Sequence, residues 1–345
     1  MKILFLTQTY LNLYKPIETE LIKQGHEVYT IADKILSFDH YYSCNSFFKR
    51  WLNGFLIKLS ESRFKLYWKN RIKMDVHLQE SFDFLLVING YSFHPYFLDF
   101  LKMRNRNIRS CLYIWDSNKY YNFFRHLPYF DKVLTFDYDD SKLINENAFL
   151  PFYWVPVNRI LPYCDLDVCC IGTNHDGRYK ILSKVKPQLE KANLASKISV
   201  CCPIVAPPHY YNLKKIKWKL LKQIDKIEYW NIATGVMNNS IIERKYYSID
   251  EINNFILRSW CVLDTDREIQ TGITPRVIWA LALGKKIIST NENLQRMPFF
   301  NKNQIRIIDR LNPVIDVDFV KEKCFFEQNE YIQNLRIDKW VKKLL

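Results

Sequence analysis

The chain has 345 residues and a formal net charge of +14, with 48% hydrophobic and 16% aromatic residues. That much apolar sequence excludes a disordered chain, and no apolar run approaches the ~20 residues that a membrane-spanning helix needs. The length accommodates two domains, and the positive excess favours an anionic partner such as a nucleic acid, a phosphorylated substrate or lipid headgroups.

The first 150 residues alternate short apolar runs with amphipathic ones. The chain is expected to open with a strand and not a signal peptide, because no small-residue cleavage site follows its short apolar run. Strands are predicted at residues 2–7, 26–32, 83–90, 110–117 and 131–137, and helices at residues 16–24 and 96–103. This alternation predicts a parallel sheet with helices on both faces, and hence an α/β domain over residues 1–150.

Residues 41–74 carry half of the positive excess, with eight Lys or Arg residues against one acid. The segment also has apolar side chains at helical spacing: Phe48, Trp51, Leu52, Phe55 and Leu59. A basic helix with an aromatic stripe suits an anionic membrane surface, so this segment is expected to hold the protein at the inner face of the cytoplasmic membrane. The alternative is a surface helix whose stripe packs on the core while its lysines are solvated.

A second α/β domain is predicted over residues 167–320, after a proline-rich linker at residues 151–166. Its expected strands are residues 167–172, 197–202, 227–233 and 260–265, the run KKIIST, and residues 304–309. Its expected helices are residues 177–192, 212–226, 248–257 and 275–283, and the tail from Val317 is also interpreted as helix. The basic helix at 212–226 is interpreted as a solvated surface helix. The nine cysteines include no C-x-x-C pair, which fits inert thiols in a reducing cytoplasm.

The loop QTGITPR precedes a predicted helix in which Thr274 is the expected N-cap and Pro275 the first residue. The loop is expected to offer free backbone N–H groups to an anion, and Arg276 adds a bidentate donor in the first turn. A cation there opposes the helix dipole, and a bound anion would offset that cost. The alternative is an ion pair between Arg276 and an acidic residue of the chain: Asp264, Asp266 or Glu268.

Four motifs resemble those of the CgeB-like glycosyltransferases of surface-polysaccharide and lipopolysaccharide synthesis. They are YIWDS (113–117), FDYDD (136–140), DVCCIGTNHDGRY (167–179) and the stretch 262–290, which holds QTGITPR and GKKIIST. The resemblance implies an α/β, GT-B fold: two Rossmann-like doubly wound parallel-sheet domains that face a central cleft. It implies an acceptor on the N-terminal domain, a nucleotide-sugar donor on the C-terminal one, and a C-terminal helix at residues 321–345 that returns toward the first domain.

By position, the resemblance also implies that Gly172, Thr173 and His175 border the donor phosphates. It implies that the diphosphate and sugar are held by residues of the later loop: Gln270, Thr271, Gly272, Thr274 and Arg276. The family commonly has a Glu before Ala-Leu, where this chain has Trp279. No metal and no permanently bound cofactor are expected; the nucleotide sugar is a co-substrate.

Metal-free glycosyl transfer needs a group that stabilises the leaving diphosphate and, for inversion, a base for the acceptor hydroxyl. Arg276 and its helix N-terminus are expected to serve the first purpose. Asp116 is the expected base, because it follows a predicted strand on the acceptor side with Trp115 beside it to line the acceptor pocket. Capping of the following turn is the alternative role of Asp116, and Asp137 and Asp140 are weaker candidates.

The sequence therefore predicts a cytoplasmic, metal-independent glycosyltransferase that moves a sugar from a nucleotide donor to a glycan or lipid-linked acceptor. Two alternatives stay open: a non-catalytic GT-B-like scaffold or sugar-binding protein, which Trp279 favours, and a basic nucleic-acid-binding protein. No known nucleic-acid-binding motif occurs, so a nucleic acid is not the expected partner. The lack of G-x-x-x-x-G-K-[ST] and G-x-G-x-x-G removes the main support for an ATPase or an NAD-dependent dehydrogenase.

Overall fold

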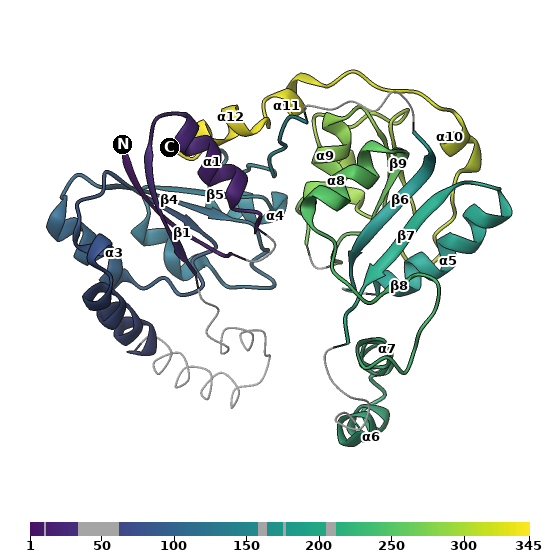
Figure 1. Ribbon diagram of the computed structural model, residues 1–345, viewed down its shortest axis with the longest axis horizontal. Helices are drawn as coiled ribbons and strands as arrows, with labels where there is room; N and C mark the ends of the chain where they lie inside the picture. The colour runs from purple at the N-terminus through teal and green to yellow at the C-terminus, as the bar shows by residue number, and fades with distance from the viewer. Residues whose placement is uncertain (10–11, 34–61, 158–163, 175–176, 205–211, 269) are drawn as a thin grey trace. The chain divides into compact units, whose positions relative to one another are not determined.

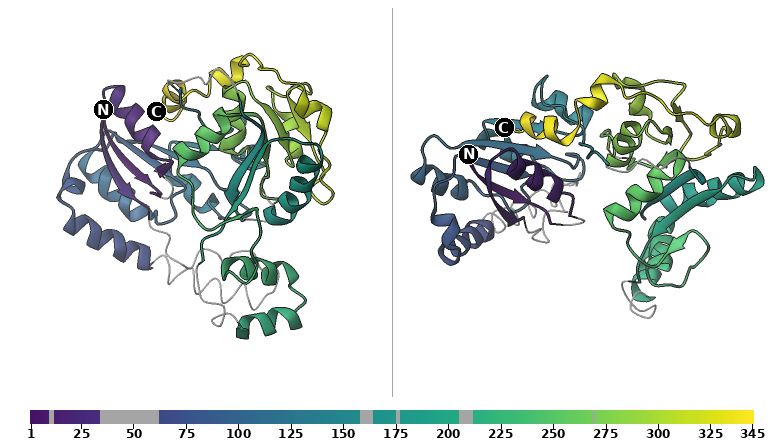
Figure 2. Two further views of the ribbon diagram at one scale, coloured as in Figure 1. Left: turned by 45° about the vertical axis from the view of Figure 1, so that its right-hand side comes forward. Right: turned by 45° about the horizontal axis from the view of Figure 1, so that its top comes forward.

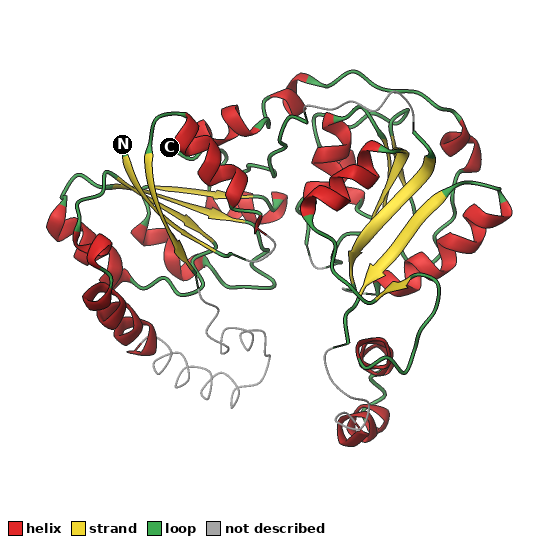
Figure 3. Cartoon of the chain, viewed as in Figure 1, coloured by secondary structure: helices red, strands yellow, loops and turns green. Residues whose placement is uncertain are grey.

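The computed structural model describes residues 1–9, 12–33, 62–157, 164–174, 177–204, 212–268 and 270–345 (Figure 1). The chain divides into two compact units. Unit 1 comprises Met1–Val155, Ile269–Ile273 and Asn334–Leu345, and unit 2 comprises Pro156–Glu268 and Thr274–Gln333. Each unit has its own β-sheet with helices packed around it (Figure 3).

The sheet of unit 1 is parallel and has the order β2-β1-β3-β4-β5. Its strands are β1 (Lys2–Thr7), β2 (Glu27–Ala32), β3 (Phe84–Ile88), β4 (Arg109–Ile114) and β5 (Lys132–Thr135). All five strands predicted for this half are confirmed, with ends shifted by up to three residues. Every residue of β3 is buried, as expected of a strand that is covered on both faces.

The helices of unit 1 are α1 (Lys15–Lys23), α3 (Pro95–Arg104), α4 (Tyr138–Ile144) and a helix at residues 62–74, with 3-10 turns η3 (Val76–Gln79) and η4 (Phe124–Tyr129). In the helix at 62–74, Phe64, Trp68 and Ile72 are buried, and the Trp68 ring stacks on Phe97 at 3.8 Å between centroids. The apolar face of this part of the basic segment therefore packs on the core. The stripe predicted from Phe48 to Leu59 lies outside the described residues.

The sheet of unit 2 is parallel and has the order β11-β10-β9-β6-β7-β8. Its strands are β6 (Leu166–Thr173), β7 (Ser196–Cys201), β8 (Ile242–Glu243), β9 (Ser259–Asp264), β10 (Lys286–Ser289) and β11 (Ile305–Ile307). The strand predicted at 227–233 is wrong, because this run belongs to helix α7 (Ile224–Ala233) and β8 takes the sheet edge. A short apolar run has no periodicity that separates a strand from a helix.

The other helices of unit 2 are α5 (Arg178–Lys191), α6 (Asn212–Leu220), α8 (Ile249–Leu257), α9 (Pro275–Ala282) and α10 (Val317–Lys321), with the 3-10 turn η6 (Glu292–Arg296). The single helix predicted at 212–226 is wrong: α6 ends and α7 begins around Lys222, whose φ is +52°. The α8 helix begins with a capping box between Ser248 and Glu251.

The continuous helix predicted from Val317 is also wrong. The tail instead forms α10, α11 (Glu330–Gln333), α12 (Ile337–Trp340) and the 3-10 turn η7 (Val341–Lys343), with α10 and α11 separated by non-helical residues. In unit 1, the buried Trp340 donates its indole N–H to the carbonyl of Pro151 at 2.8 Å. None of the helices formed by the described residues combines the length and apolarity that crossing a bilayer requires.

The motif GKK, which follows α9, has a structural role. Gly284 has φ +67°, and a Cβ there would lie 2.4 Å from the Phe326 carbonyl oxygen, so glycine ends the helix as predicted. Lys285 and Lys286 are both buried. The Lys286 ammonium donates to the carbonyls of Phe319 and Glu322 and to the Glu322 carboxylate, which satisfies a cation that burial alone would destabilise.

Candidate functional site

The order of strands places a switch point in unit 2 between β6 and β9. The chain runs from β6 outward through β7 to β8, and then returns to the other side of β6 with β9. Ligands of doubly wound sheets bind outside the carboxyl ends of the strands at such a point. Gly172 and Thr173 end β6 and Asp264 ends β9, so the predicted loops do flank this position.

Arg178, in the first turn of α5, is the central buried cation of this edge, and it is 7% exposed. Its Nε donates to the Thr265 hydroxyl at 2.6 Å, its Nη2 to the Thr265 carbonyl at 2.7 Å, and its Nη1 to the Thr173 carbonyl. A Cβ on Gly172 would lie 2.5 Å from Nη1. The glycine is therefore needed to leave room for the guanidinium.

Arg276 lies in the first turn of α9, as predicted, with its Nη2 3.7 Å from the Asp264 carboxylate and its Nη1 3.8 Å from the Cys170 sulfur. The ion pair with Asp264 was the alternative to a phosphate role. Thr274 occupies the N-cap position, but its hydroxyl donates to Asp264 at 2.8 Å and does not cap the helix. The expected capping bond is therefore replaced by one that orients the Asp264 carboxylate.

The two guanidinium groups influence each other. Burial, followed by the positive charge of Arg276, lowers the pKa of Arg178 to about 10. Burial is the strongest influence on the pKa of Arg276 and lowers it, but the Asp264 carboxylate and the sulfurs of Cys170 and Cys169 together raise it by more, so that the net pKa is raised. One buried and one half-buried guanidinium that share the field of the Asp264 carboxylate leave a positive excess at the edge, which an anionic ligand would neutralise.

The segment Gln270, Thr271 and Gly272 belongs to unit 1 and not to the unit of Arg276. The backbone N–H groups of Thr271 and Gly272 donate to the Asp137 carboxylate at 2.8 and 3.2 Å, as does the Thr271 hydroxyl. The prediction that these N–H groups are free is therefore wrong, because an internal carboxylate takes the place expected of a phosphate. Gln270 is half-buried beside them.

The ring of Phe136 explains the glycine in QTGITPR. A Cβ on Gly272 would lie 2.2 to 2.6 Å from three atoms of that ring. The φ of Gly272 is not in the left-handed region, so the requirement is for space. Asp137 also caps α4 by accepting from the backbone N–H groups of Asp139 and Asp140, so one carboxylate orders both segments.

Asp116 stands at the carboxyl edge of the sheet of unit 1, half-buried after β4. Its carboxylate accepts from the Asn89 amide at 2.8 Å and from the Tyr91 hydroxyl. Asn89 has φ +59° and accepts from the Trp115 backbone N–H, which links the ends of β3 and β4. These hydrogen bonds fix the direction of the Asp116 carboxylate. The predicted role of Trp115 is not borne out, because its ring is buried in stacked contact with Phe152.

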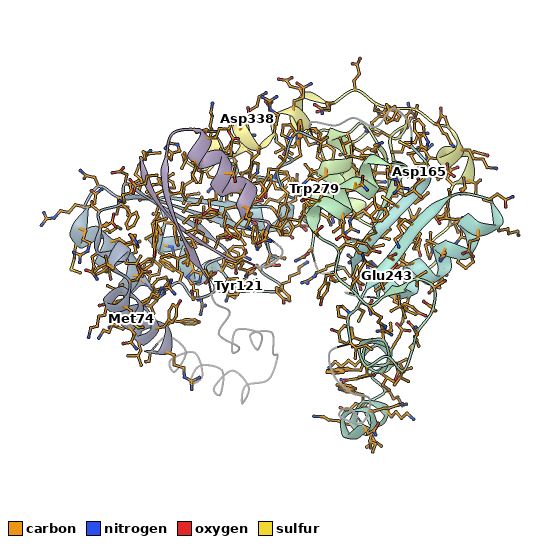
Figure 4. The ribbon with its side chains drawn as sticks, viewed as in Figure 1. Met74, Tyr121, Asp165, Glu243, Trp279 and Asp338 are labelled. Carbon is orange, nitrogen blue, oxygen red and sulfur yellow. The ribbon has the colours of Figure 1, made fainter. Side chains whose placement is uncertain are left out.

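An aromatic and imidazole cluster next to Asp116 was missed from the sequence. The ring of Tyr121, which Figure 4 labels, lies 4.3 Å from that of Tyr91. Its hydroxyl lies 3.0 Å from the Gly90 carbonyl oxygen and 2.7 Å from Nε2 of His126. His126 is buried, and burial holds its pKa well below the usual range. The run YYNFFRH carries no catalytic spacing, so only the fold brings these groups to Asp116.

A cavity of about 610 Å³ opens in unit 2 at the N-terminus of α5. Its lining includes Lys180, Lys184, Lys226 and Arg310, together with Glu228 and Glu268. The Arg310 guanidinium donates to the Asp266 carboxylate at 2.6 Å, so this cation is anchored from the β9 side. Within the described ranges, no three His, Cys, Asp or Glu side chains lie together as metal ligands would.

Comparisons with known proteins agree on the architecture. No family model and no curated protein matches the chain. Among solved structures, it is similar to an α,α-trehalose-phosphate synthase (UDP-forming) from Burkholderia vietnamiensis, at 9% identity and a TM-score of 0.53, over 99% of this chain and 98% of that one. It is also similar to the trehalose-6-phosphate synthase OtsA, at 9% identity and a TM-score of 0.51, over the same shares.

The fold is GT-B. The prediction of two Rossmann-like domains is therefore confirmed. Within this GT-B chain, Gly172, Thr173, Thr274 and Arg276 come together at one edge of unit 2, whereas Thr271 and Gly272 lie in unit 1. His175 lies outside the described residues. Trp279 is half-buried on α9, one turn after Arg276 (Figure 4).

Proposed function

We propose that the protein is a glycosyltransferase that binds a nucleoside-diphosphate sugar at the carboxyl edge of the unit 2 sheet. The observation that carries the proposal is a pair of guanidiniums, the buried Arg178 and the half-buried Arg276, at the switch point near Asp264. A diphosphate supplies the negative charge that this pair lacks. Arginine suits the role because its planar donors match two phosphate oxygens at once.

A uridine nucleotide is the donor we propose to test first. One of the similar structures is described as UDP-forming, and both are trehalose-phosphate synthases. The basic cavity beside α5 gives room for part of a nucleotide, with Lys180, Lys184 and Arg310 at its wall. Glu268, which also lines this cavity, is a candidate for the carboxylate that the family places at the position of Trp279.

In the reaction we propose, the acceptor oxygen attacks the anomeric carbon of the donor and the bond from that carbon to the diphosphate oxygen breaks. Arg276 stabilises the charge that gathers on the leaving diphosphate. For an inverting transfer, Asp116 takes the proton of the acceptor hydroxyl, and its hydrogen bonds from Asn89 and Tyr91 fix its direction. No metal is needed for these steps, since the guanidinium supplies the positive charge.

The acceptor we propose is a glycan or lipid-linked glycan of surface-polysaccharide or lipopolysaccharide synthesis, which the four sequence motifs support. The association of residues 41–74 with an anionic inner-membrane surface stays a prediction. In its described part, Phe64, Trp68 and Ile72 are buried in the core, whereas Leu66 and Met74 are exposed. Lys65 and Lys69 each lie 5.8 Å from the centre of the Tyr96 ring.

Thermal unfolding in the presence of nucleotides tests the donor proposal directly. A ligand that binds the native state raises the unfolding midpoint, so UDP and UDP-sugars should raise it more than GDP or ADP. Arg276→Ala should lose that rise, whereas the control Arg106→Ala, at an exposed position of unit 1, should keep it. Equal midpoints with and without every nucleotide would contradict the proposal.

A non-catalytic nucleotide-sugar-binding protein is the second candidate. It is favoured by the Asp137 carboxylate, which occupies the N–H groups of Thr271 and Gly272 that the motif assigns to the donor. Glycosyltransferases commonly hydrolyse their donor slowly when no acceptor is present. Binding of UDP-sugars without any release of UDP over long incubation would favour the second candidate over the first.

A further inference from the structure

The hairpin of α6 and α7, defined here as residues 212–233, presents an apolar surface that the described residues of unit 2 leave exposed. Ile216, Leu220, Leu221 and Ile224 are 57%, 79%, 54% and 70% exposed. Four aliphatic side chains this exposed within nine residues form a patch, whereas single exposed leucines are ordinary. Figure 1 and the left view of Figure 2 show α6 standing apart from the sheet of unit 2.

The two helices of the hairpin pack against each other through other side chains, so this apolar surface faces outward. The Trp218 ring of α6 stacks on the Trp230 ring of α7 at 5.9 Å, and Ile232 and Ala233 at the end of α7 are buried in the core of unit 2. Trp218 lies on the helix face that meets α7. Ile216 and Leu220 are four residues apart, so they share a face, which is turned away from that contact. Lysines of the hairpin are solvated, as expected of a surface helix, but these aliphatic side chains are solvated as well.

The patch is surrounded by positive charge. The hairpin contains six lysines and two acids. Lys217, Lys219, Lys222 and Lys226 are exposed, and each lies within four residues of an exposed aliphatic side chain. Aliphatic side chains that point outward among lysines match a bilayer surface, where the apolar groups enter the boundary of the acyl chains and the ammonium groups meet anionic headgroups.

We propose that the α6–α7 hairpin docks on an anionic lipid surface, with Leu220, Leu221 and Ile224 inserted at the headgroup boundary. Charge complementarity and the aliphatic character of the patch select a lipid bilayer over a nucleic acid, because nucleic acids gain from arginine and exposed aromatic rings more than from leucine. The inference concerns a surface of unit 2 and does not depend on the proposed catalytic activity. It also differs from docking through residues 41–74.

Sedimentation of the full chain with vesicles, without donor or acceptor, tests the proposal. We expect binding to vesicles that contain about one-third phosphatidylglycerol, weak binding to pure phosphatidylcholine, and a decrease with salt. Replacing Lys217, Lys219 and Lys222 by Gln should weaken the vesicle partition coefficient roughly a hundredfold, since each lysine near the surface contributes about a factor of five. Replacing Leu220 and Leu221 by Ser should weaken it on the order of tenfold at every salt concentration.

Matched controls use equally exposed positions elsewhere. Met103→Ser with Leu143→Ser replaces side chains that are 73% and 65% exposed in unit 1, and Gln replaces the exposed lysines Lys102, Lys302 and Lys321. These variants should bind vesicles like the parent chain. Unchanged thermal midpoints would show that the hairpin variants fold.

Three results would overturn the proposal. The first is vesicle binding that survives both hairpin variants but is lost on neutralising Lys65, Lys69, Arg71 and Lys73. The second is a loss of self-association in the Leu220→Ser, Leu221→Ser variant by sedimentation velocity, without any vesicle binding by the parent chain, since the patch would then meet a second copy. The third is retention of a labelled oligonucleotide by the hairpin lysines in the absence of vesicle binding.

Discussion

The two sheets share a parallel, doubly wound plan and both have acids at their carboxyl edges, but only the edge of unit 2 pairs its acids, Asp264 and Asp266, with arginines in the described residues. The edge of unit 1 has buried or half-buried acids beyond the ends of three strands, β2, β4 and β5: Asp33, Asp116, Asp137 and Asp140. The Asp33 carboxylate accepts hydrogen bonds from the Tyr91 and Ser92 N–H groups. The edge of unit 2 has Arg178, Arg276 and Arg310, each near an acid or a carbonyl. One topology therefore serves two purposes: oriented carboxylates suit a hydroxyl-bearing substrate, and guanidiniums suit a phosphate.

The largest effect is expected from the arginine edge. Arg276→Ala should lower kcat by roughly a thousandfold, because a charge that acts on the leaving diphosphate is lost. Arg276→Lys should retain only part of the parent kcat, since lysine lacks the two parallel N–H donors of a guanidinium. Initial rates of UDP release measure both variants. Near-normal turnover in Arg276→Ala would show that Arg276 serves only as the ion-pair partner of Asp264 and does not act on the diphosphate.

The carboxylate edge should respond differently. Asp116→Asn should lower the transfer rate by roughly a hundredfold while nucleotide binding is unchanged, because an amide keeps the hydrogen bond from Asn89 but cannot take a proton. Calorimetric titration with UDP beside the transfer rate separates the two effects. If donor binding falls together with the rate, the division of chemistry between the two edges is wrong.

The loop that belongs to unit 1 gives a stability test. Gly272→Ala should lower the free energy of unfolding by about 1–3 kcal/mol, because the new methyl group meets the Phe136 ring. In a chain that also carries Phe136→Leu, Gly272→Ala should lower the free energy of unfolding by less, since the smaller leucine side chain can move away from the new methyl group. Chemical denaturation of the four chains of this double-mutant cycle measures the coupling. If the two substitutions lower the free energy of unfolding additively, the Phe136 ring is not the reason for a glycine at position 272.

The smallest effect concerns Asp140. Burial raises its pKa to about 6, and the Asp137 carboxylate adds to this against the hydrogen bond from the Asn118 N–H. The folded state then holds a proton that the unfolded state releases from about pH 4 upward, so the free energy of unfolding falls as the pH rises from about 4 to 6 and is level above. Asp140→Asn should remove this pH dependence and raise the free energy of unfolding at pH 7 by at most about 3 kcal/mol.

Urea unfolding at several pH values measures this pH dependence. Asp139→Asn is a matched control, because Asp139 lies next to Asp140 on α4 and its side chain is 45% exposed. A parent chain whose stability rises between pH 4 and pH 6 through Asp140 would contradict the assignment of a raised pKa.

The sequence by itself determined the order of elements and most of their bounds. Alternating strands and helices, Gly25 and Gly284 at helix ends, and the helix start at Pro275 are local signals, because they depend on backbone geometry and on burial of one strand or helix. The same local character explains the errors. The run IEYWNIA is too short to show its period, and the tail after Val317 has helix-forming composition but packs as separate turns.

Only the tertiary structure decided what the motif residues contact. In QTGITPR, the sequence located a helix N-terminus and a cation, but the N–H groups of Thr271 and Gly272 bind Asp137, more than 130 residues earlier in the chain. Arg178 became a site residue because folding buries it beside Gly172 and Thr265. Spacing along the chain specifies secondary structure, whereas hydrogen-bond partners depend on which strand ends the sheet order brings together.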